Sequence, residues 1–374
     1  MNQTMNFQFQ SLAEWGFRSS HPFVVSGPCG IETEEQIHAT AQAMNNGLVH
    51  LLRGGIWKPR TRPDSFQGIG KEGLKWLKDA GIENKLPVTV EVASPKHIEE
   101  ALSAGIDVLW IGARTTVNPF LIQEIADALK GIDIPVMIKN PINPELELWI
   151  GAIERIYNSG IHRLAAVHRG FSTYEKTKYR NIPNWQIPIE LKRRYPDLPL
   201  ICDPSHICGQ KEMIQAVAQT ALDLNYNGLM IETHIDPEIA LSDKQQQLTP
   251  AALVELLQSL VIRKPSTDDI IFINLLEELR DKIDLVDGEI LSLISDRMGI
   301  ARDIGRYKKE NNMTILQEKR WKEIMTTRLQ FGLNKDLTSE FIVKLYELIH
   351  DESIHQQMRV MNSIDLEKEN INHP

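Results

Sequence analysis

Positively charged side chains cluster directly after an apolar segment near the start of the chain. The run LVHLLRGGIW, which is typical of a buried strand, is followed by KPRTRPDSFQ, so that Lys58 and Arg60 lie just beyond Arg53. A buried strand has no structural need for such charges. Arg binds phosphate and carboxylate groups through paired hydrogen bonds, and Lys is a point charge that can also transfer a proton. The pattern therefore predicts an anion-binding site.

Eight short apolar runs occur within the first 235 residues, and each ends in a residue whose side chain could take part in catalysis or binding. The stretches between them, such as EEQIHATAQAMNN and NPFLIQEIADALKG, mostly have helical periodicity. The strand starts are roughly 20 to 40 residues apart, the size of one βα unit. The residues at the strand ends are Cys29, Lys58 with Arg60, Glu91, Arg114, Lys139, His168 with Arg169, Asp203 with His206, and Glu232 with His234.

Eight βα units predict a (β/α)8 barrel, in which the carboxyl ends of all the strands meet at the face where active sites are built. A doubly wound open sheet is the alternative, but no G-x-G-x-x-G motif follows the first strand. The cations at this face would form a pocket for two phosphorylated, carboxylated substrates, unless they pair with acidic neighbours such as Glu91. These cations are Arg53, Lys58, Arg60, Arg114, Lys139 and Arg169.

A second group at the same face has mixed thiol, imidazole and carboxylate chemistry. It comprises Cys29, His206, Glu232 and Asp243, the last within ALSDKQQQL. Such ligands fit a divalent transition metal such as Mn, Fe, Co or Zn. A buried structural cysteine and histidine are the alternative, because these residues lie far apart in sequence.

The composition narrows the function classes. The chain has 374 residues, 42% hydrophobic and 24% charged, and a net charge of −9, which argues against a nucleic-acid partner. Three cysteines are too few for a disulfide framework, which favours a reducing, cytoplasmic location. The first residues lack a secretory signal pattern, and the absence of an 18-residue apolar run predicts no membrane span.

Several motifs resemble 3-deoxy-D-arabino-heptulosonate 7-phosphate (DAHP) synthase. They are SGPCGIE, RGGIWKPRTRPDSFQGIG, IGAR, MIKN, HRG, DPSHICG and GLMIETHIDPEIALSDKQQQL, which place the domain at residues 21–262 after a short extension, residues 1–20. The resemblance implies a metal-dependent barrel that condenses phosphoenolpyruvate with erythrose 4-phosphate. The alternative is 3-deoxy-D-manno-octulosonate 8-phosphate synthase, which usually reads KANR where this chain has KPRT.

The resemblance also implies roles for the residues in these motifs. Lys58 would be the proton donor, and Cys29, His206, Glu232 and Asp243 would hold the metal. Pro59, Arg60 and Thr61 would join Lys58 in binding erythrose 4-phosphate. The phosphoenolpyruvate site would comprise Arg53, Lys58, Ala113, Arg114, Lys139 and Arg169.

The last hundred residues have a different pattern. After a linker at 263–267, apolar positions recur at helical spacing over about 268–309, and shorter helices are expected at about 317–331 and 338–360. A helix of about 40 residues is about 60 Å long at 1.5 Å per residue, so it needs a partner chain to cover it unless its glycines break it. Arg297 and Lys308 share one helix face, whereas Arg280 points about 100° away.

This region, 268–360, is similar to the all-helical chorismate mutases through LRDKIDLVDGEILSLISDRMGIARDIGRYKKEN, QEKRW and HDESIHQQM. The resemblance implies an intertwined homodimer that converts chorismate to prephenate. The implied chorismate site comprises Arg280 of the second copy, Arg297, Lys308, Gln317, Arg320 and Gln357, with Lys308 and Gln357 donating to the ether oxygen. Gln317 and Trp321 stand where the family often has acidic residues. A domain that acts only in dimerisation and sensing is therefore the alternative.

Regulation is expected through this second domain. The extension at 1–20 is too short for a separate small-molecule-binding domain, so the helical domain is the remaining candidate sensor. We expect prephenate or chorismate to inhibit the condensation. Residues 361–374 are expected to form a C-terminal tail.

Overall fold

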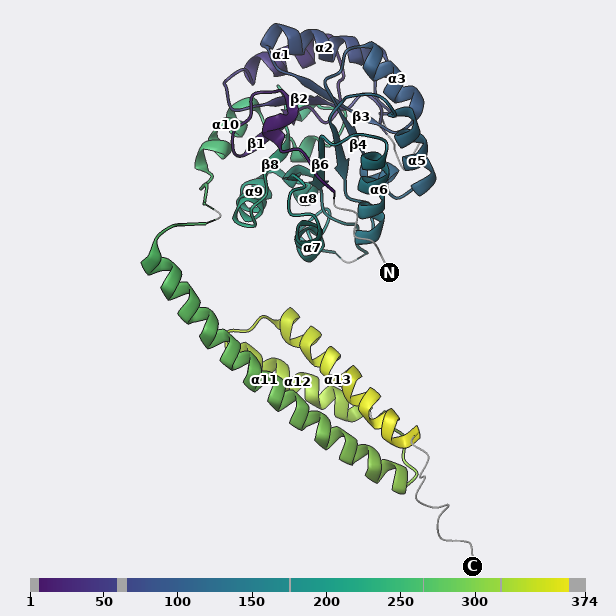
Figure 1. Ribbon diagram of the computed structural model, residues 1–374, viewed down its shortest axis with the longest axis vertical. Helices are drawn as coiled ribbons and strands as arrows, with labels where there is room; N and C mark the ends of the chain where they lie inside the picture. The colour runs from purple at the N-terminus through teal and green to yellow at the C-terminus, as the bar shows by residue number, and fades with distance from the viewer. Residues whose placement is uncertain (1–6, 59–65, 175, 265, 317, 363–374) are drawn as a thin grey trace, which may run out of the picture. The chain divides into compact units, whose positions relative to one another are not determined.

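The chain forms two compact units, residues 1–265 and 266–374. The computed structural model describes residues 7–58, 66–174, 176–264, 266–316 and 318–362. Figure 1 shows the first unit as strands ringed by helices and the second as three long helices.

The first unit is a closed barrel of eight parallel strands, which confirms the predicted fold and excludes the open sheet. Each strand pairs with its neighbour in sequence, and β8 closes the ring on β1 with Val24 opposite Leu229. The strands are β1 (Phe23–Gly27), β2 (Leu51–Gly54), β3 (Val88–Val92), β4 (Val108–Ile111), β5 (Val136–Lys139), β6 (Leu164–His168), β7 (Leu200–Cys202) and β8 (Gly228–Glu232).

Helices form the outer layer of the barrel, and side-chain caps define where several of them begin. Thr33, Ser94 and Thr249 each accept a hydrogen bond from a first-turn N–H and so satisfy a group that the helix itself leaves unpaired. The helices are α1 (Glu34–Ala43), α2 (Glu72–Asn84), α3 (Pro95–Ser103), α4 (Ala113–Thr116), α5 (Pro119–Ala128), α6 (Leu146–Asn158), α7 (Gln186–Arg194), α8 (Pro204–Cys208), α9 (Ile214–Asp223) and α10 (Pro250–Ser259).

The barrel has two apolar cores. One lies between strands and helices, and the other is built from inward-facing strand residues such as Trp110 and Met137. Leu12 and Trp15, in the short helix η1 (Leu12–Trp15), belong to this inner core. The expected N-terminal extension therefore contributes to the barrel itself.

A buried histidine lies at the amino-terminal ends of the strands. His50 directly precedes β2, and its Nδ1 accepts a hydrogen bond from the Val24 N–H at 3.0 Å. Its Nε2 lies 2.7 Å from the Ser20 hydroxyl. Burial lowers the pKa of His50 to about 4, so this imidazole is neutral at pH 7.

The second unit consists of α11 (Ile270–Glu310), α12 (Glu318–Leu333) and α13 (Ser339–Asn362), as the sequence predicts. The 41-residue α11 runs unbroken through its glycines. Gly305 has a packing role, because a Cβ at this position would lie 3.1 Å from the Gln357 Cα of α13. Among the described residues, no helix of either unit has the length and apolar character needed to span a membrane.

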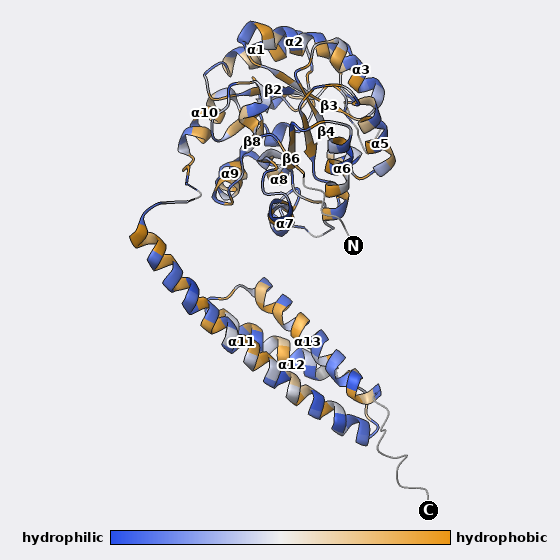
Figure 2. Ribbon diagram, viewed as in Figure 1, coloured by the Kyte–Doolittle hydropathy of each residue, from blue (hydrophilic) through white to orange (hydrophobic). Residues whose placement is uncertain are grey.

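The first half of α11 carries an uncovered apolar stripe. Its residues are spaced alternately four and three apart, the repeat by which helices pair, and Figure 2 shows apolar positions along this helix. Each is 47% to 68% exposed within one chain. The stripe consists of Leu279, Ile283, Val286, Ile290 and Leu293.

Candidate active sites

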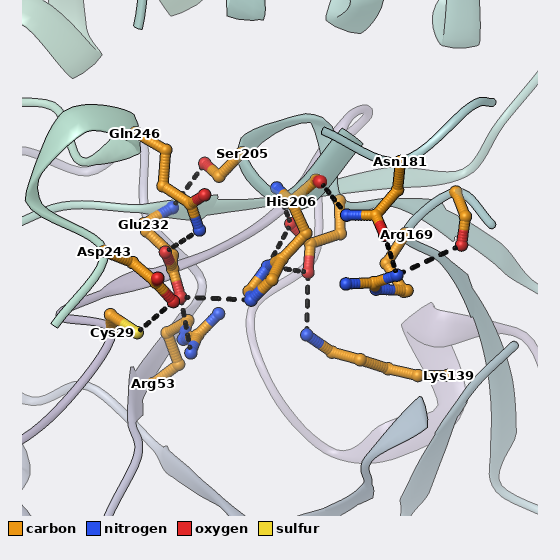
Figure 3. A network of polar contacts seen from close by, with 12 residues as sticks. Cys29, Arg53, Lys139, Arg169, Asn181, Ser205, His206, Glu232, Asp243 and Gln246 are labelled. Atoms are coloured by element: carbon orange, nitrogen blue, oxygen red, sulfur yellow. Dashed lines mark hydrogen bonds and ion pairs between the residues drawn. The ribbon is translucent and has the colours of Figure 1, made fainter. Parts of the chain in front are cut away.

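The four predicted metal ligands converge at the carboxyl ends of the barrel strands (Figure 3). Cys29 follows β1, Glu232 ends β8, and Asp243 lies in the next loop; their ligand atoms are within 4.8 Å of one another. The Cys29 thiol donates to Asp243 Oδ2 at 3.3 Å. His206, on α8, completes the group, with its Nε2 at 3.7 Å from Glu232 Oε1.

The chemistry of this group fits a divalent transition metal. Burial, reinforced by the charge of Glu232, raises the pKa of the Cys29 thiol to about 12. Glu232 is fully buried, and its Oε1 accepts no hydrogen bond from any described residue. A thiol that is costly to ionise and a buried carboxylate oxygen that accepts no hydrogen bond would both be stabilised by a bound cation.

Asp203 orients His206. Its Oδ1 accepts from His206 Nδ1 at 3.0 Å and from the His206 main-chain N–H at 3.1 Å. Burial lowers the pKa of His206, which leaves the ring neutral with its Nε2 free to act as a ligand. Lys139 Nζ lies 2.7 Å from Asp203 Oδ2. Although burial acts in the opposite direction, His206 and Lys139 hold the pKa of Asp203 well below its usual value.

The predicted cations gather beside these ligands. One pocket is lined by Cys29, Arg53, Lys58, Glu91, Arg114, Lys139, His206 and Asp243. Lys58 Nζ lies 3.0 Å from Cys29 Sγ and also donates to the Cys29 carbonyl. Arg53 is buried on β2 with its Nη2 at 3.1 Å from Glu232 Oε1, yet its Nε and Nη1 have no acceptor among the described residues. This pocket can therefore receive an anion.

The other predicted substrate residues lie just beyond the ends of neighbouring strands. Ala113 begins α4, directly before the exposed Arg114. Arg169 follows β6; it is buried and donates to Asn181 Oδ1 at 2.6 Å. Burial lowers the pKa of this guanidinium to about 10. Asn181 in turn donates to the His206 carbonyl at 2.6 Å. Pro59, Arg60 and Thr61 lie outside the described residues.

Some strand-end residues have structural roles instead. Both ring nitrogens of His168 are occupied, by the Tyr226 hydroxyl at 3.0 Å and the Pro183 carbonyl at 2.6 Å. His234 Nδ1 accepts from the Asp236 N–H at 2.9 Å. Their position at the strand ends does not make them site residues.

The sequence analysis missed three residues that contact the ligand group: Arg180, Gln246 and Gln247. Gln247 accepts from the Cys29 N–H at 2.8 Å, and Gln246 donates to Glu232 Oε2 at 2.7 Å. The only sequence signal for the two glutamines is that QQQ begins two residues after the predicted ligand Asp243.

A second pocket lies within the helical unit and brings together four of the predicted chorismate residues. Arg297 donates to Ser353 Oγ, and Lys308 Nζ donates to the Ile315 carbonyl. Gln357 Oε1 is buried without a hydrogen-bond donor among the described residues. The lining residues are Arg297, Ile300, Ala301, Ile304, Lys308, Ile315, Arg320, Trp321, Ile324, His350, Ser353 and Gln357.

One predicted chorismate residue, Arg280, does not line this pocket. Arg280 is exposed and pairs with Glu277 at 2.6 Å. Gln317 lies outside the described residues. Trp321 lines the pocket and stacks on His350 with ring centroids 4.1 Å apart. An aromatic wall therefore stands where the family often has a carboxylate.

Enzymes with this barrel fold build their active sites at the carboxyl ends of the strands. The cations in both pockets define the protein as a two-unit enzyme for small anionic substrates. Comparison with known proteins identifies the family. Residues 18–265 match the DAHP synthetase I family, to which the chain belongs, and residues 279–358 match chorismate mutase type II. The chain is therefore a bifunctional enzyme with a DAHP synthase domain and a chorismate mutase domain.

Individual relatives agree with this assignment. A phospho-2-dehydro-3-deoxyheptonate aldolase of Thermotoga maritima is 32% identical over 237 residues, 63% of this chain and 68% of that protein. A crystal structure of DAHP synthase from Thermotoga maritima has a TM-score of 0.58 at 31% identity, covering 63% of this chain and 67% of that one. A 2-dehydro-3-deoxyphosphooctonate aldolase of Vesicomyosocius okutanii is 27% identical over 64% of this chain and 90% of its own length. The octulosonate alternative is not favoured.

Proposed function

We propose that the barrel condenses phosphoenolpyruvate with erythrose 4-phosphate in the pocket beside Cys29, with a divalent ion held by Cys29, His206, Glu232 and Asp243. The observation that carries this proposal is the convergence of a thiol, an imidazole and two carboxylates on a cluster of cations. The ion would polarise the aldehyde oxygen as a Lewis acid. C3 of phosphoenolpyruvate bonds to the aldehyde carbon, water adds at C2, and phosphate leaves.

The cations of the pocket have distinct tasks in this reaction. Arg53 has two buried guanidinium nitrogens without acceptors among the described residues, and Arg169 is fixed by Asn181, so both can bind oxyanions with little reorganisation. Lys139 is buried and paired with Asp203, which keeps a fixed charge beside the substrate. Arg114 completes the phosphoenolpyruvate site, whose backbone contact is Ala113.

Lys58 is the proposed proton donor. Its Nζ lies against Cys29, and therefore next to the place where the aldehyde oxygen would be bound. A donor within hydrogen-bond reach of the reacting oxygen is the first requirement for general acid catalysis. Pro59, Arg60 and Thr61, which follow it directly in sequence, are proposed to bind the erythrose 4-phosphate end.

The helical pocket is proposed to rearrange chorismate to prephenate. Arg297 and Arg320 would bind the two carboxylates, while Lys308 and Gln357 would donate to the ether oxygen as its bond breaks. No proton transfer is needed, because fixed charges and a closely fitting pocket stabilise the compact, polarised transition state. Gln317 is proposed to contact the chorismate hydroxyl.

A second copy of this chain is proposed to cover the apolar stripe of α11. The alternating four- and three-residue spacing is that of paired helices, and the stripe buries little against its own unit. Pairing would also deliver Arg280 of one chain to the pocket of the other. The helical unit is thus both a dimerisation element and a catalytic domain.

We also propose feedback control and a cytoplasmic location. Prephenate or chorismate bound in the helical pocket would inhibit the condensation. Such inhibition requires that the ligand bind more tightly to a less active conformation of the protein than to a more active one. Three free cysteines, all buried, suit a reducing compartment.

A single protein preparation tests whether condensation, and not chorismate rearrangement, depends on a metal ion. Chelator-treated, metal-free protein should lose condensation of erythrose 4-phosphate, recover it on adding Mn²⁺ or Co²⁺, and retain chorismate turnover throughout. Arabinose 5-phosphate should be the poorer substrate. Full condensation activity in metal-free protein would contradict the metal site, and a preference for arabinose 5-phosphate would contradict the substrate.

A further inference from the structure

The two carboxylate ligands are joined by a chain of hydrogen bonds through residues that are neither proposed ligands nor proposed substrate contacts. Gln246 Nε2 donates to Glu232 Oε2 at 2.7 Å, a contact visible in Figure 3. The side-chain oxygen Gln246 Oε1 accepts from Arg180 Nη1 at 2.7 Å. The same Arg180 nitrogen lies 3.0 Å from Asp243 Oδ1. Glu232 and Asp243, which come from different elements, are thereby tied together.

Because of these hydrogen bonds, the two oxygens of each carboxylate, Glu232 and Asp243, have different partners. Glu232 uses Oε2 for Gln246, and its Oε1 lies 3.1 Å from Arg53 Nη2 and 3.7 Å from His206 Nε2. Asp243 uses Oδ1 for Arg180, and its Oδ2 meets Cys29 Sγ at 3.3 Å. One oxygen of each residue is therefore fixed from outside, while the other points to the remaining members of the ligand group.

We propose that Gln246 and Arg180 are positioning residues for the metal, which hold the outer oxygens of Glu232 and Asp243 and so present Glu232 Oε1 and Asp243 Oδ2 to the ion. This rests on the proposed metal site. Residues that hold ligands from outside typically change metal affinity by 10- to 100-fold when removed.

The residue types suit this role. Position 246 must donate to a carboxylate and accept from a guanidinium at the same time, which the glutamine amide does with its two ends. Gln246 is only 1% exposed, so an unpaired polar group there would be costly. Arg180 adds a fixed positive charge that offsets the repulsion between two close carboxylates.

The backbone makes room for Arg180. Gly209, which ends α8, has a φ of 71°, and a Cβ at this position would lie 2.5 Å from Arg180 Cβ. The Arg180 N–H also donates to the Cys208 carbonyl at 3.3 Å. The segment carrying Arg180 therefore packs directly on the helix that carries His206.

The test uses the full-length apoprotein titrated with Co²⁺, following the thiolate-to-metal absorption band. Gln246→Met keeps the side-chain length and removes both hydrogen bonds, whereas Arg180→Met removes the charge at a half-exposed position and leaves the fold least affected. Gln245→Met is the matched control, because Gln245 is exposed in the same segment. We expect each test variant to bind Co²⁺ about 10- to 100-fold more weakly, and the control to bind like the wild type.

The double variant distinguishes a shared role from two separate ones. Because both residues act through one hydrogen-bonded chain, their combined loss in affinity should be smaller than the product of the single losses. Wild-type affinity in a folded Arg180→Met or Gln246→Met protein would overturn the proposal, as would a raised KM for erythrose 4-phosphate with Co²⁺ affinity unchanged. Failure of the wild-type protein to bind Co²⁺ would instead refute the underlying metal site.

Discussion

Replacing Asp203 with Asn should weaken metal binding without changing the shape of the site. The Asp203 carboxylate accepts hydrogen bonds on both oxygens, from the His206 ring and main chain and from Lys139. An asparagine side chain has one acceptor end and one donor end. Whichever way the amide turns, its NH₂ group faces another donor, either the Lys139 ammonium or the His206 N–H.

The expected magnitude follows from the role of this contact. Without a carboxylate on Nδ1, His206 loses the charged acceptor that fixes its tautomer and ring orientation. We expect metal affinity to fall about 10- to 100-fold, or about 1.4 to 2.7 kcal/mol. Titration of the full-length apoprotein with Co²⁺ measures the loss directly. Condensation should recover partly at high Co²⁺ concentration, because Cys29, Glu232 and Asp243 remain.

Asp107→Asn is the matched control. Asp107 also accepts from a lysine, Lys78 at 3.0 Å, and from a main-chain N–H, that of Val88 at 2.9 Å. It directly precedes β4, at the opposite end of the barrel from the metal site. Unchanged Co²⁺ affinity in a folded Asp203→Asn protein, or an equal loss in Asp107→Asn, would refute the argument.

Three further predictions follow from other parts of the chain. Because the folded-state pKa of His50 is about 4, below the usual 6.5, its contribution to stability is full above pH 6.5 and is lost as pH falls toward 4. In thermal unfolding, His50→Gln should therefore make the melting temperature depend less on pH between 6.5 and 4. Leu279→Lys with Ile283→Lys should shift the chain toward monomer in analytical ultracentrifugation and remove mutase activity, whereas Asp281→Lys, on the opposite helix face, should do neither. Arg297→Met should abolish inhibition of condensation by prephenate while leaving the uninhibited rate unchanged; retained inhibition would place the sensor elsewhere.

The sequence predicted the barrel well because its signals are local. Each strand is an apolar run that ends in a polar residue, and each helix has its own periodicity. Helix α11 was also predictable from a local signal, its repeat of apolar residues, and the helix continues through Gly288 and Gly299. The role of residues 7–20 was not visible, because nothing in that segment shows that Leu12 and Trp15 pack inside the barrel.

The sequence indicated the charged residues of the candidate site, but not the residues whose partners are distant in sequence. Cys29, Lys58 and Glu232 stand out because a thiol or charge at a strand end has no packing role. Gln246 and Arg180 do not stand out in the sequence. Gln246 contacts Glu232, 14 residues away, Arg180 contacts Asp243, 63 residues away, and glutamine is common on surfaces. Only the fold shows which polar residues meet.

We propose that condensation and chorismate rearrangement occur at two separate active sites of one chain. The most direct test assays condensation and chorismate turnover side by side in Lys58→Met and Arg297→Met proteins. Lys58→Met removes the proposed proton donor and should stop condensation while leaving mutase turnover near normal. Arg297→Met removes a carboxylate-binding cation and should do the reverse. Loss of both activities in each well-folded variant would contradict the two-site account.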